Sequence, residues 1–146
     1  MPPLDDIQSA NKQLVREAFA VVDAHQFDRL RELMSESVVC HMVGVAESMD
    51  RESAIEFIRR AYESFPDFAH ELHDIIAEDD KVMVRLTNRT THSKDFEGLA
   101  PTGKRIEFAS AHLLTIEDGA IKEWWLLDDN YGFLSQLGMV MVTGEQ

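Results

Sequence analysis

The chain has a single cysteine, Cys40, among its 146 residues, so no internal disulfide can form. Basic residues are scarce as well: 14 lysines and arginines stand against 27 acidic residues, and the formal net charge is −13. This charge argues against nucleic acid and anionic membranes as partners. No apolar run approaches the roughly 20 residues that span a bilayer. The first residues, MPPLDDIQSANKQ, lack the basic and apolar segments of a secretory signal. We therefore expect a cytoplasmic protein.

Patterns that would hold a metal or a phosphate group are also missing. The glycines are scattered, and none leads from a strand into a helix as in a phosphate-binding loop. His70 and His73 are close in sequence, but on a strand they point to opposite faces. The same holds for the neighbours Cys40 and His41, so no thiol dyad is expected. The sequence predicts neither a metal site nor a cofactor.

The residues that are present suit one globular domain. Hydrophobic residues make up 45% of the chain, and its length is sufficient for one core. We expect a domain over residues 10–139, with tails at 1–9 and 140–146. Apolar residues recur at helical spacing from about residue 10, again over 29–34, and most clearly over 49–65. Asp50 is a suitable N-cap for this last helix, and Pro66 ends it.

The second half of the chain has the alternation of β-strands. A short strand is predicted at 38–45, and four more at 70–77, 82–92, 106–116 and 120–127. Asp118-Gly119 is a strong hairpin signal between the last two. This order predicts an α+β fold in which N-terminal helices pack on a strongly curved, mostly antiparallel sheet. Such a sheet forms a cone with an open mouth, where small ligands bind.

Two adjacent carboxylates, Asp128 and Asp129, end the last strand. Strand alternation puts Trp125 and Asp129 on one face and Asp128 on the other. Counting outward from the hairpin turn pairs His112 with Trp125, which places Asp129 near His112. Asp128 is expected to be a cap or a surface carboxylate. Asp129 could instead face solvent or cap the segment 130–137, without any role in a pocket.

Three stretches resemble a known family. They are FPDF at 65–68, DDKVMVRLTNRTTHSKDFEGLAPTGKRIEF at 79–108 and IEDGAIKEWWLLDDNYGFLSQLG at 116–138. In this order the chain resembles the SnoaL-like polyketide cyclases, or ester cyclase-like proteins, of the nuclear transport factor 2-like superfamily. The resemblance runs from about residue 11 to 138. Trp125, Asp129 and Gln136 keep the family spacing, which implies that Asp129 is the catalytic acid/base, whereas Thr90 replaces a usual glycine.

The resemblance implies an enzyme that needs no cofactor, of the cyclase or isomerase-type lyase class. It would catalyse intramolecular aldol cyclisation, or a related proton transfer next to a carbonyl, on a small hydrophobic carbonyl-containing ligand. Burial against Trp125 and Leu127, together with the charge of Asp128, is expected to raise the pKa of Asp129. Two alternatives remain open. One is an isomerase, dehydratase or hydrolase that uses the same pocket, and the other is a non-catalytic module that binds a small molecule or a protein.

His112 is predicted as the second catalytic residue, which donates a hydrogen bond to a substrate oxygen, with a core position as its alternative. The predicted substrate-binding residues are Trp125, His41, Phe108, His92 and Tyr62; a core position is also open for His41. Arg85 is expected to pair with an acid such as Glu107 or Glu123.

The superfamily commonly dimerises through the sheet. We therefore expect a homodimer or a higher homo-oligomer, with Leu113, Trp124 and Leu126 as apolar residues of the outer face.

Overall fold

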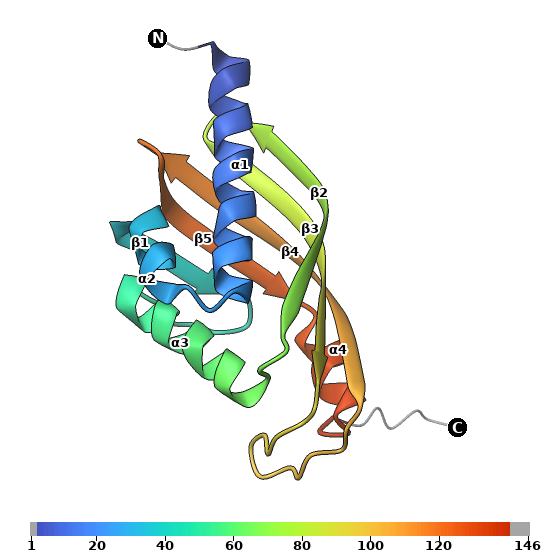
Figure 1. Ribbon diagram of the computed structural model, residues 1–146. Coiled ribbons are helices and arrows are strands. Elements are labelled where there is room, and N and C mark those ends of the chain that lie inside the picture. The colour runs from blue at the N-terminus through green and yellow to red at the C-terminus, as the bar shows by residue number, and fades with distance from the viewer. Residues whose placement is uncertain (1–2, 141–146) are drawn as a thin grey trace.

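A five-stranded sheet forms the body of the molecule in the computed structural model, which describes residues 3–140 (Figure 1). The elements are α1 (Leu4–Asp23), α2 (Phe27–Leu33), β1 (Met34–Met42), α3 (Arg51–Ser64), β2 (Ala69–Glu78), β3 (Lys81–Thr91), β4 (Arg105–Glu117), β5 (Ala120–Asp128) and α4 (Asn130–Gln136). The strand order is β1-β5-β4-β3-β2, and only the β1–β5 pair is parallel. Helix α1 lies across one face of this curved sheet, with α2 and α3 beside it (Figure 1). The predicted α+β fold is confirmed.

Helix α1 begins at Leu4, earlier than the sequence pattern indicated. The predicted tail at 1–9 is therefore wrong from Leu4 onward. Asp5 and Asp6 lie in the first turn, where negative charge interacts favourably with the helix dipole. Most of the other predicted tail, 140–146, lies outside the described residues. Met34, predicted to end the second helix, instead begins β1 and pairs with Ile121.

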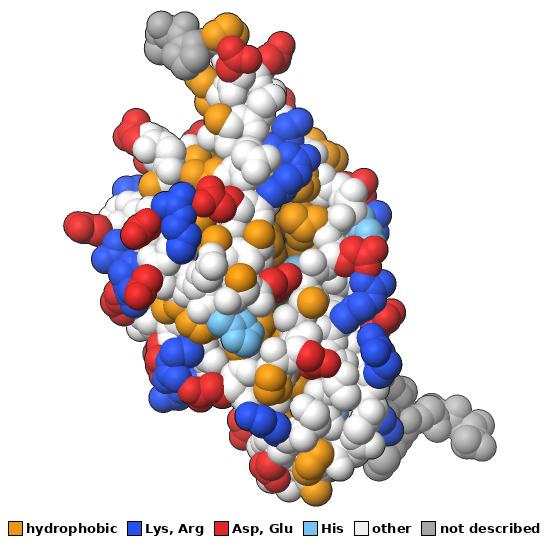
Figure 2. All heavy atoms as spheres, viewed as in Figure 1, with side chains coloured by type: hydrophobic (Ala, Val, Ile, Leu, Met, Phe, Trp, Pro, Cys, Tyr) orange, Lys and Arg blue, Asp and Glu red, His pale blue; other side chains and the backbone are white. Residues whose placement is uncertain are grey.

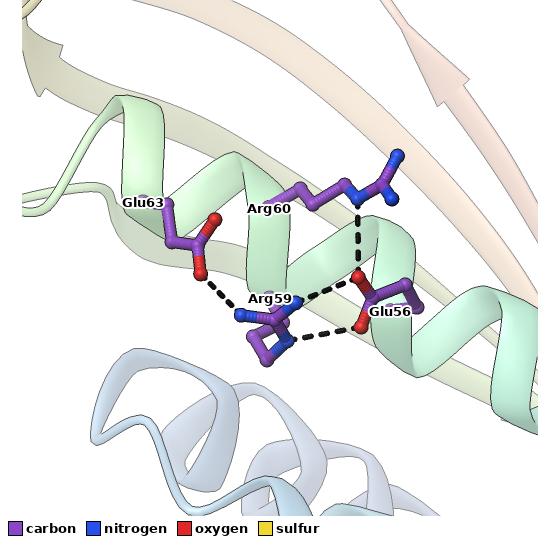
Figure 3. Close-up of polar contacts among 4 residues, drawn as sticks. All are labelled: Glu56, Arg59, Arg60 and Glu63. Carbon is purple, nitrogen blue, oxygen red and sulfur yellow. Dashed lines mark hydrogen bonds and ion pairs between the residues drawn. The ribbon is translucent and has the colours of Figure 1, made fainter.

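Helix α3 follows its prediction closely and forms one wall of the concave side. The Asp50 carboxylate accepts a hydrogen bond from Ser53 N at 2.8 Å and caps the helix. The buried side carries Ile55 and Tyr62. On the exposed side, ion pairs link Glu56 to two arginines and Arg59 to Glu63 (Figure 3).

A β-bulge in β5 changes which side chains face the core. Thr115 pairs with Glu123, but Ile116 pairs with Ile121, so Lys122 is an extra residue between them. We call this the Lys122 bulge. Ile121 and Trp124 are both buried although they are three residues apart. His112 consequently pairs with Leu126, and the predicted pairing with Trp125 is wrong. One extra residue moves every later side chain of the strand to the opposite face.

The bulge also alters the outer face of the sheet. Trp124 is buried against the core and Leu126 packs on it, so their prediction as outer residues is wrong. Trp125 is instead 37% exposed. A row of cross-strand partners runs over the outer face through Ile76, Met83, Leu113 and Trp125. Three of these side chains are among the exposed large hydrophobic residues, and Leu113 is half-buried.

The apolar interior has two parts. The larger cluster fills the space between the sheet and helices α1 to α3. A smaller one, formed by Phe65, Ile106 and Leu137 with neighbouring phenylalanines, lies beneath the connection between β3 and β4. Over residues 3–140, no helix is both long and apolar enough to cross a membrane.

Candidate active site

The concave side of the sheet encloses a small apolar cavity of about 100 Å³. Its walls come from α1, α3 and the sheet. The lining residues are Phe19, Val22, Phe57, Ile58, Ala61, Tyr62, Phe68, His70, Asn88, Phe108, His112, Trp124, Leu126 and Asp128. An outer cavity of about 410 Å³ shares Phe57, Ala61, Phe68, Phe108 and Asp128 with it. The two are therefore adjacent parts of one cleft, and Asp128 lies where they meet.

The Asp128 carboxylate is held through one of its oxygens. Oδ1 accepts hydrogen bonds from Ser110 Oγ at 2.5 Å and His112 Nε2 at 3.0 Å. Ser110 in turn accepts a bond from Asn88 Nδ2 at 2.6 Å. Within residues 3–140, no hydrogen bond reaches Oδ2. This second oxygen is therefore available to a ligand in the cleft.

The hydrogen bonds of His112 define its protonation. The Trp124 indole can only donate, and its Nε1 lies 3.0 Å from His112 Nδ1. Nδ1 must therefore accept, and Nε2 carries the proton that goes to Asp128. Both ring nitrogens are engaged, so His112 orients the carboxylate and has no free donor for a substrate oxygen.

Burial and hydrogen bonding act in opposite directions on Asp128. Removal from water acts to raise the pKa of this carboxyl, whereas the bonds from His112 and Ser110 act to lower it. The lowering prevails, and the pKa of Asp128 lies below its ordinary value. Asp128 is therefore ionised at neutral pH, in contrast to the raised pKa that the sequence predicted for the adjacent aspartate.

Asp129, the predicted catalytic residue, has a different environment. Its exposed carboxylate accepts a hydrogen bond from Gly132 N at 2.8 Å and caps α4. It does not line either part of the cleft. The expectation that Asp129 shares a face with His112 is wrong, because the Lys122 bulge turns Asp128 inward in its place. Gln136, the end of the family spacing, bonds the backbone of Glu107 and ties α4 to β4.

The other predicted contact residues divide into two groups. Tyr62 and Phe108 line the inner cavity. Trp125 and His41 lie on the outer face, where their rings stack with centroids 3.9 Å apart. Neither ring lines the cleft, so the predicted position of both residues is wrong. For Trp125 the cause is again the Lys122 bulge, whereas His41 lies on β1.

His92 is fully buried and holds the β3–β4 connection. Its Nδ1 accepts a hydrogen bond from Thr102 N at 3.2 Å. It contributes to neither cavity wall. Arg85 pairs with Asp74 instead of the predicted Glu107 or Glu123.

Sequence reasoning missed a second polar cluster at the cavity. Asp23, at the end of α1, accepts hydrogen bonds from Tyr62 Oη at 2.7 Å and from the backbone N of His70 at 3.0 Å. His70 Nδ1 lies 2.6 Å from the same carboxylate. Burial acts to raise the pKa of Asp23, but its bonds to His70 and Tyr62 and the charge of His70 lower it overall. The sequence signal that could have indicated this cluster is His70 itself, a histidine at an inward position of the strand predicted over 70–77.

Other reactive groups are remote from this chemistry. Burial raises the pKa of the Cys40 thiol to about 12, so it is protonated at neutral pH. Among residues 3–140, no three His, Cys, Asp or Glu side chains are grouped so that they could hold a metal ion.

Comparisons with known proteins agree with this architecture. IdmH from Streptomyces antibioticus, a candidate polyketide cyclase, has a TM-score of 0.82 at 29% identity, over 88% of this chain and 98% of its own. AclR from Streptomyces galilaeus, a candidate hydroxylase, has a TM-score of 0.83 at 25% identity, over 92% and 99%. An LEH-like epoxide hydrolase of M. tuberculosis has the same fold, with a TM-score of 0.71 at 18% identity, over 89% and 90%.

No curated protein matches the chain significantly. The profile of the SnoaL-like polyketide cyclases, in contrast, matches residues 12–137. Since this match covers most of the sequence, the chain belongs to the SnoaL-like polyketide cyclase family.

Proposed function

We propose that this protein is a cofactor-independent enzyme that removes a proton next to a carbonyl of a small hydrophobic substrate, with Asp128 as the base. Intramolecular aldol cyclisation of a polyketide ester is the reaction that we favour. One observation carries the proposal: the Asp128 carboxyl group lies in an apolar cleft, held by two hydrogen bonds at Oδ1 and, within residues 3–140, by none at Oδ2. We thus assign to Asp128 the acid/base role that the sequence predicted for Asp129.

The arrangement around Asp128 suits proton abstraction. Ser110 and His112 fix the direction of the carboxylate, so little reorganisation is needed when a substrate carbon approaches Oδ2. Phenylalanines such as Phe68 and Phe108 make the walls around this carboxylate apolar. General base catalysis of this kind contributes roughly 10²- to 10⁴-fold to a rate. We assign His112 as a positioning residue, because its two nitrogens are already bonded to Trp124 and Asp128.

The lowered pKa of Asp128 limits the substrates that it can deprotonate. A carboxylate that is readily ionised is a weak base, so the substrate must have an acidic carbon–hydrogen bond. A carbon that lies between two carbonyl groups meets this requirement, since its enolate is delocalised. Poly-β-ketone chains contain such carbons at regular intervals.

The proposal can be tested with β-tetralone, a bicyclic ketone with exchangeable protons beside its carbonyl. Proton NMR in deuterium oxide would follow the loss of these signals with the wild type and two variants. We expect Asp128→Asn to lose roughly 10²- to 10⁴-fold of the enzyme-dependent rate. Asp129→Asn is the matched control, since asparagine also caps helices and the cavity is untouched.

The outcomes separate the possible roles of the two aspartates. Full activity of Asp128→Asn would refute Asp128 as the base. Loss of activity only in Asp129→Asn would return the role to that residue. If wild-type protein binds the ketone without exchanging its protons, the non-catalytic binding module is favoured. Product analysis with an extended substrate then distinguishes cyclisation from other reactions, because only cyclisation forms a new carbon–carbon bond.

We also propose that the protein forms a homodimer through the outer face of the sheet. The row Ile76, Met83, Leu113 and Trp125 gives this face a continuous apolar surface across four strands. Such a surface on a soluble chain is typical of an interface.

A further inference from the structure

The proposed reaction needs a proton donor for the substrate oxygen as well as a base for its carbon. Most polar groups of the inner cavity already donate their hydrogens to other protein groups. The two amide hydrogens of Asn88 go to Phe108 O and Ser110 Oγ, and Tyr62 donates its hydroxyl proton to Asp23. His112 has both nitrogens engaged.

His70 differs from these groups. Its Nδ1 is bonded to Asp23 at 2.6 Å, which leaves Nε2 on the opposite side of the ring. Within the described part of the chain, Nε2 has no hydrogen-bond partner, and it is not one of the fully enclosed polar atoms. The ring packs between Phe19 and Phe68, with both centroid distances 5.1 Å, and it lines the inner cavity.

Building on the proposed function, we propose that His70 is a second catalytic residue, which donates its Nε2 proton to the substrate oxygen while Asp128 removes the proton from carbon. The carbon–hydrogen bond breaks, and its electron pair forms the carbon–carbon double bond of the enol. The carbonyl π electrons move to oxygen, which takes the proton from Nε2. Asp128 ends protonated and His70 neutral, and proton exchange with water restores both.

The charges around His70 suit this role. Asp23 lies on α1, Asp128 on β5 and the Tyr62 hydroxyl on α3, while neutral His112 lies on β4. The charge of a protonated His70 acts on both carboxylates and helps to lower the pKa of each. Asp23 and Tyr62 are positioning residues: Asp23 holds the ring through Nδ1, and the Tyr62 hydroxyl holds the Asp23 carboxylate.

A first experiment tests the geometry without any substrate. Long-range proton–nitrogen NMR distinguishes the two neutral tautomers of histidine. When neutral, His70 should carry its proton on Nδ1, whereas His112 should carry it on Nε2. The Asp23→Asn variant should change the His70 pattern and leave that of His112 unchanged. A neutral His70 with its proton on Nε2 would overturn the assigned orientation.

A second experiment measures the donor directly. β-Naphthol resembles the enol of β-tetralone, and its fluorescence distinguishes naphthol from naphtholate. The neutral amide in the Asp128→Asn variant imitates the protonated base. In this variant we expect the fluorescence of bound β-naphthol to be that of naphtholate. Adding His70→Gln should weaken this binding about tenfold or more and remove the naphtholate signal. His73→Gln is the matched control, because this exposed histidine on the same strand bonds Thr87.

The β-tetralone exchange assay separates this inference from the proposed function. Loss of exchange in both Asp128→Asn and His70→Gln, with His73→Gln active, supports the paired roles. Loss only in Asp128→Asn overturns the role of His70 and leaves the proposed function intact. Retention in both variants overturns the proposed function itself. Unchanged β-naphthol binding after His70→Gln would also refute the donor, and thermal unfolding would check that each variant is folded.

Discussion

Ser110 and His112 both donate to the same oxygen of Asp128, and this division between the two oxygens is central to the site. One oxygen is used for orientation, while the other remains available for chemistry. The neighbouring Asp129 uses its carboxylate to cap α4. Two residues of the same type, adjacent in the chain, thus have separate structural roles.

The hydrogen bonds to Asp128 should make stability depend on pH. The folded-state pKa of this carboxyl is lowered, so its ionised form stabilises the fold above the unfolded value of about 3.9. This contribution is lost as pH falls through the lower folded-state pKa. Urea unfolding should therefore show Asp128→Asn to be less stable than wild type at neutral pH, with a smaller difference near pH 3. A difference that is independent of pH would contradict this assignment.

Residue identities alone could not distinguish the two aspartates. The predicted alternation in β4 is correct, and it places Phe108, Ser110 and His112 on the concave side. The error arose in β5, where Lys122 is inserted without a glycine or any other local signal. Tertiary packing of Ile121 and Trp124 on the same core explains why the bulge forms there.

At the scale of elements, the strands were more predictable than the helix ends. Strong alternation placed β2 to β5 close to their observed bounds, and Asp118-Gly119 located the hairpin. The start of α1 is not evident in the sequence because its first turn carries Asp5 and Asp6 and its apolar residue there, Leu4, is largely exposed. A cavity between elements depends on packing that no local pattern contains, and for this reason the Asp23–His70 contact was also missed.

The ion pairs on the exposed side of α3 should contribute modestly to stability. Glu56 contacts both Arg59 and Arg60, whereas Glu63 contacts only Arg59 (Figure 3). We expect Glu56→Gln to lower the melting temperature slightly more than Glu63→Gln, as measured by circular dichroism. Both decreases should shrink in about 1 M salt, where exposed charges are screened. Decreases that persist at high salt would indicate a cause other than charge.

At the scale of the whole molecule, charged side chains occur on both faces: on the outer face of the sheet, Arg85 pairs with Asp74 and Arg89 with Glu107 beside the apolar row. Acidic and basic side chains are interspersed over the face that carries α1 (Figure 2). The apolar row Ile76, Met83, Leu113 and Trp125 lies on the outer face of the sheet, away from the helices.

The proposed homodimer should depend on this row. Sedimentation velocity at micromolar concentration should give a dimer for the wild type and a monomer for Met83→Glu, since a charge in an apolar interface is costly. Val45→Asp is a control, because this residue is exposed outside the sheet. A monomeric wild type would refute the proposal, as would a Met83→Glu variant that remains dimeric.

Asp128 lies where a small inner cavity meets a larger outer one, and under the proposed chemistry this position sets the regioselectivity. A long substrate can insert one end only until the walls of the inner cavity stop it. The carbon beside Oδ2 is then a fixed number of bonds from that end. Substrates of different lengths would react at the same position counted from the inserted end, with the remainder extending outward. The depth of the inner cavity, more than the identity of the base, would determine which ring is formed.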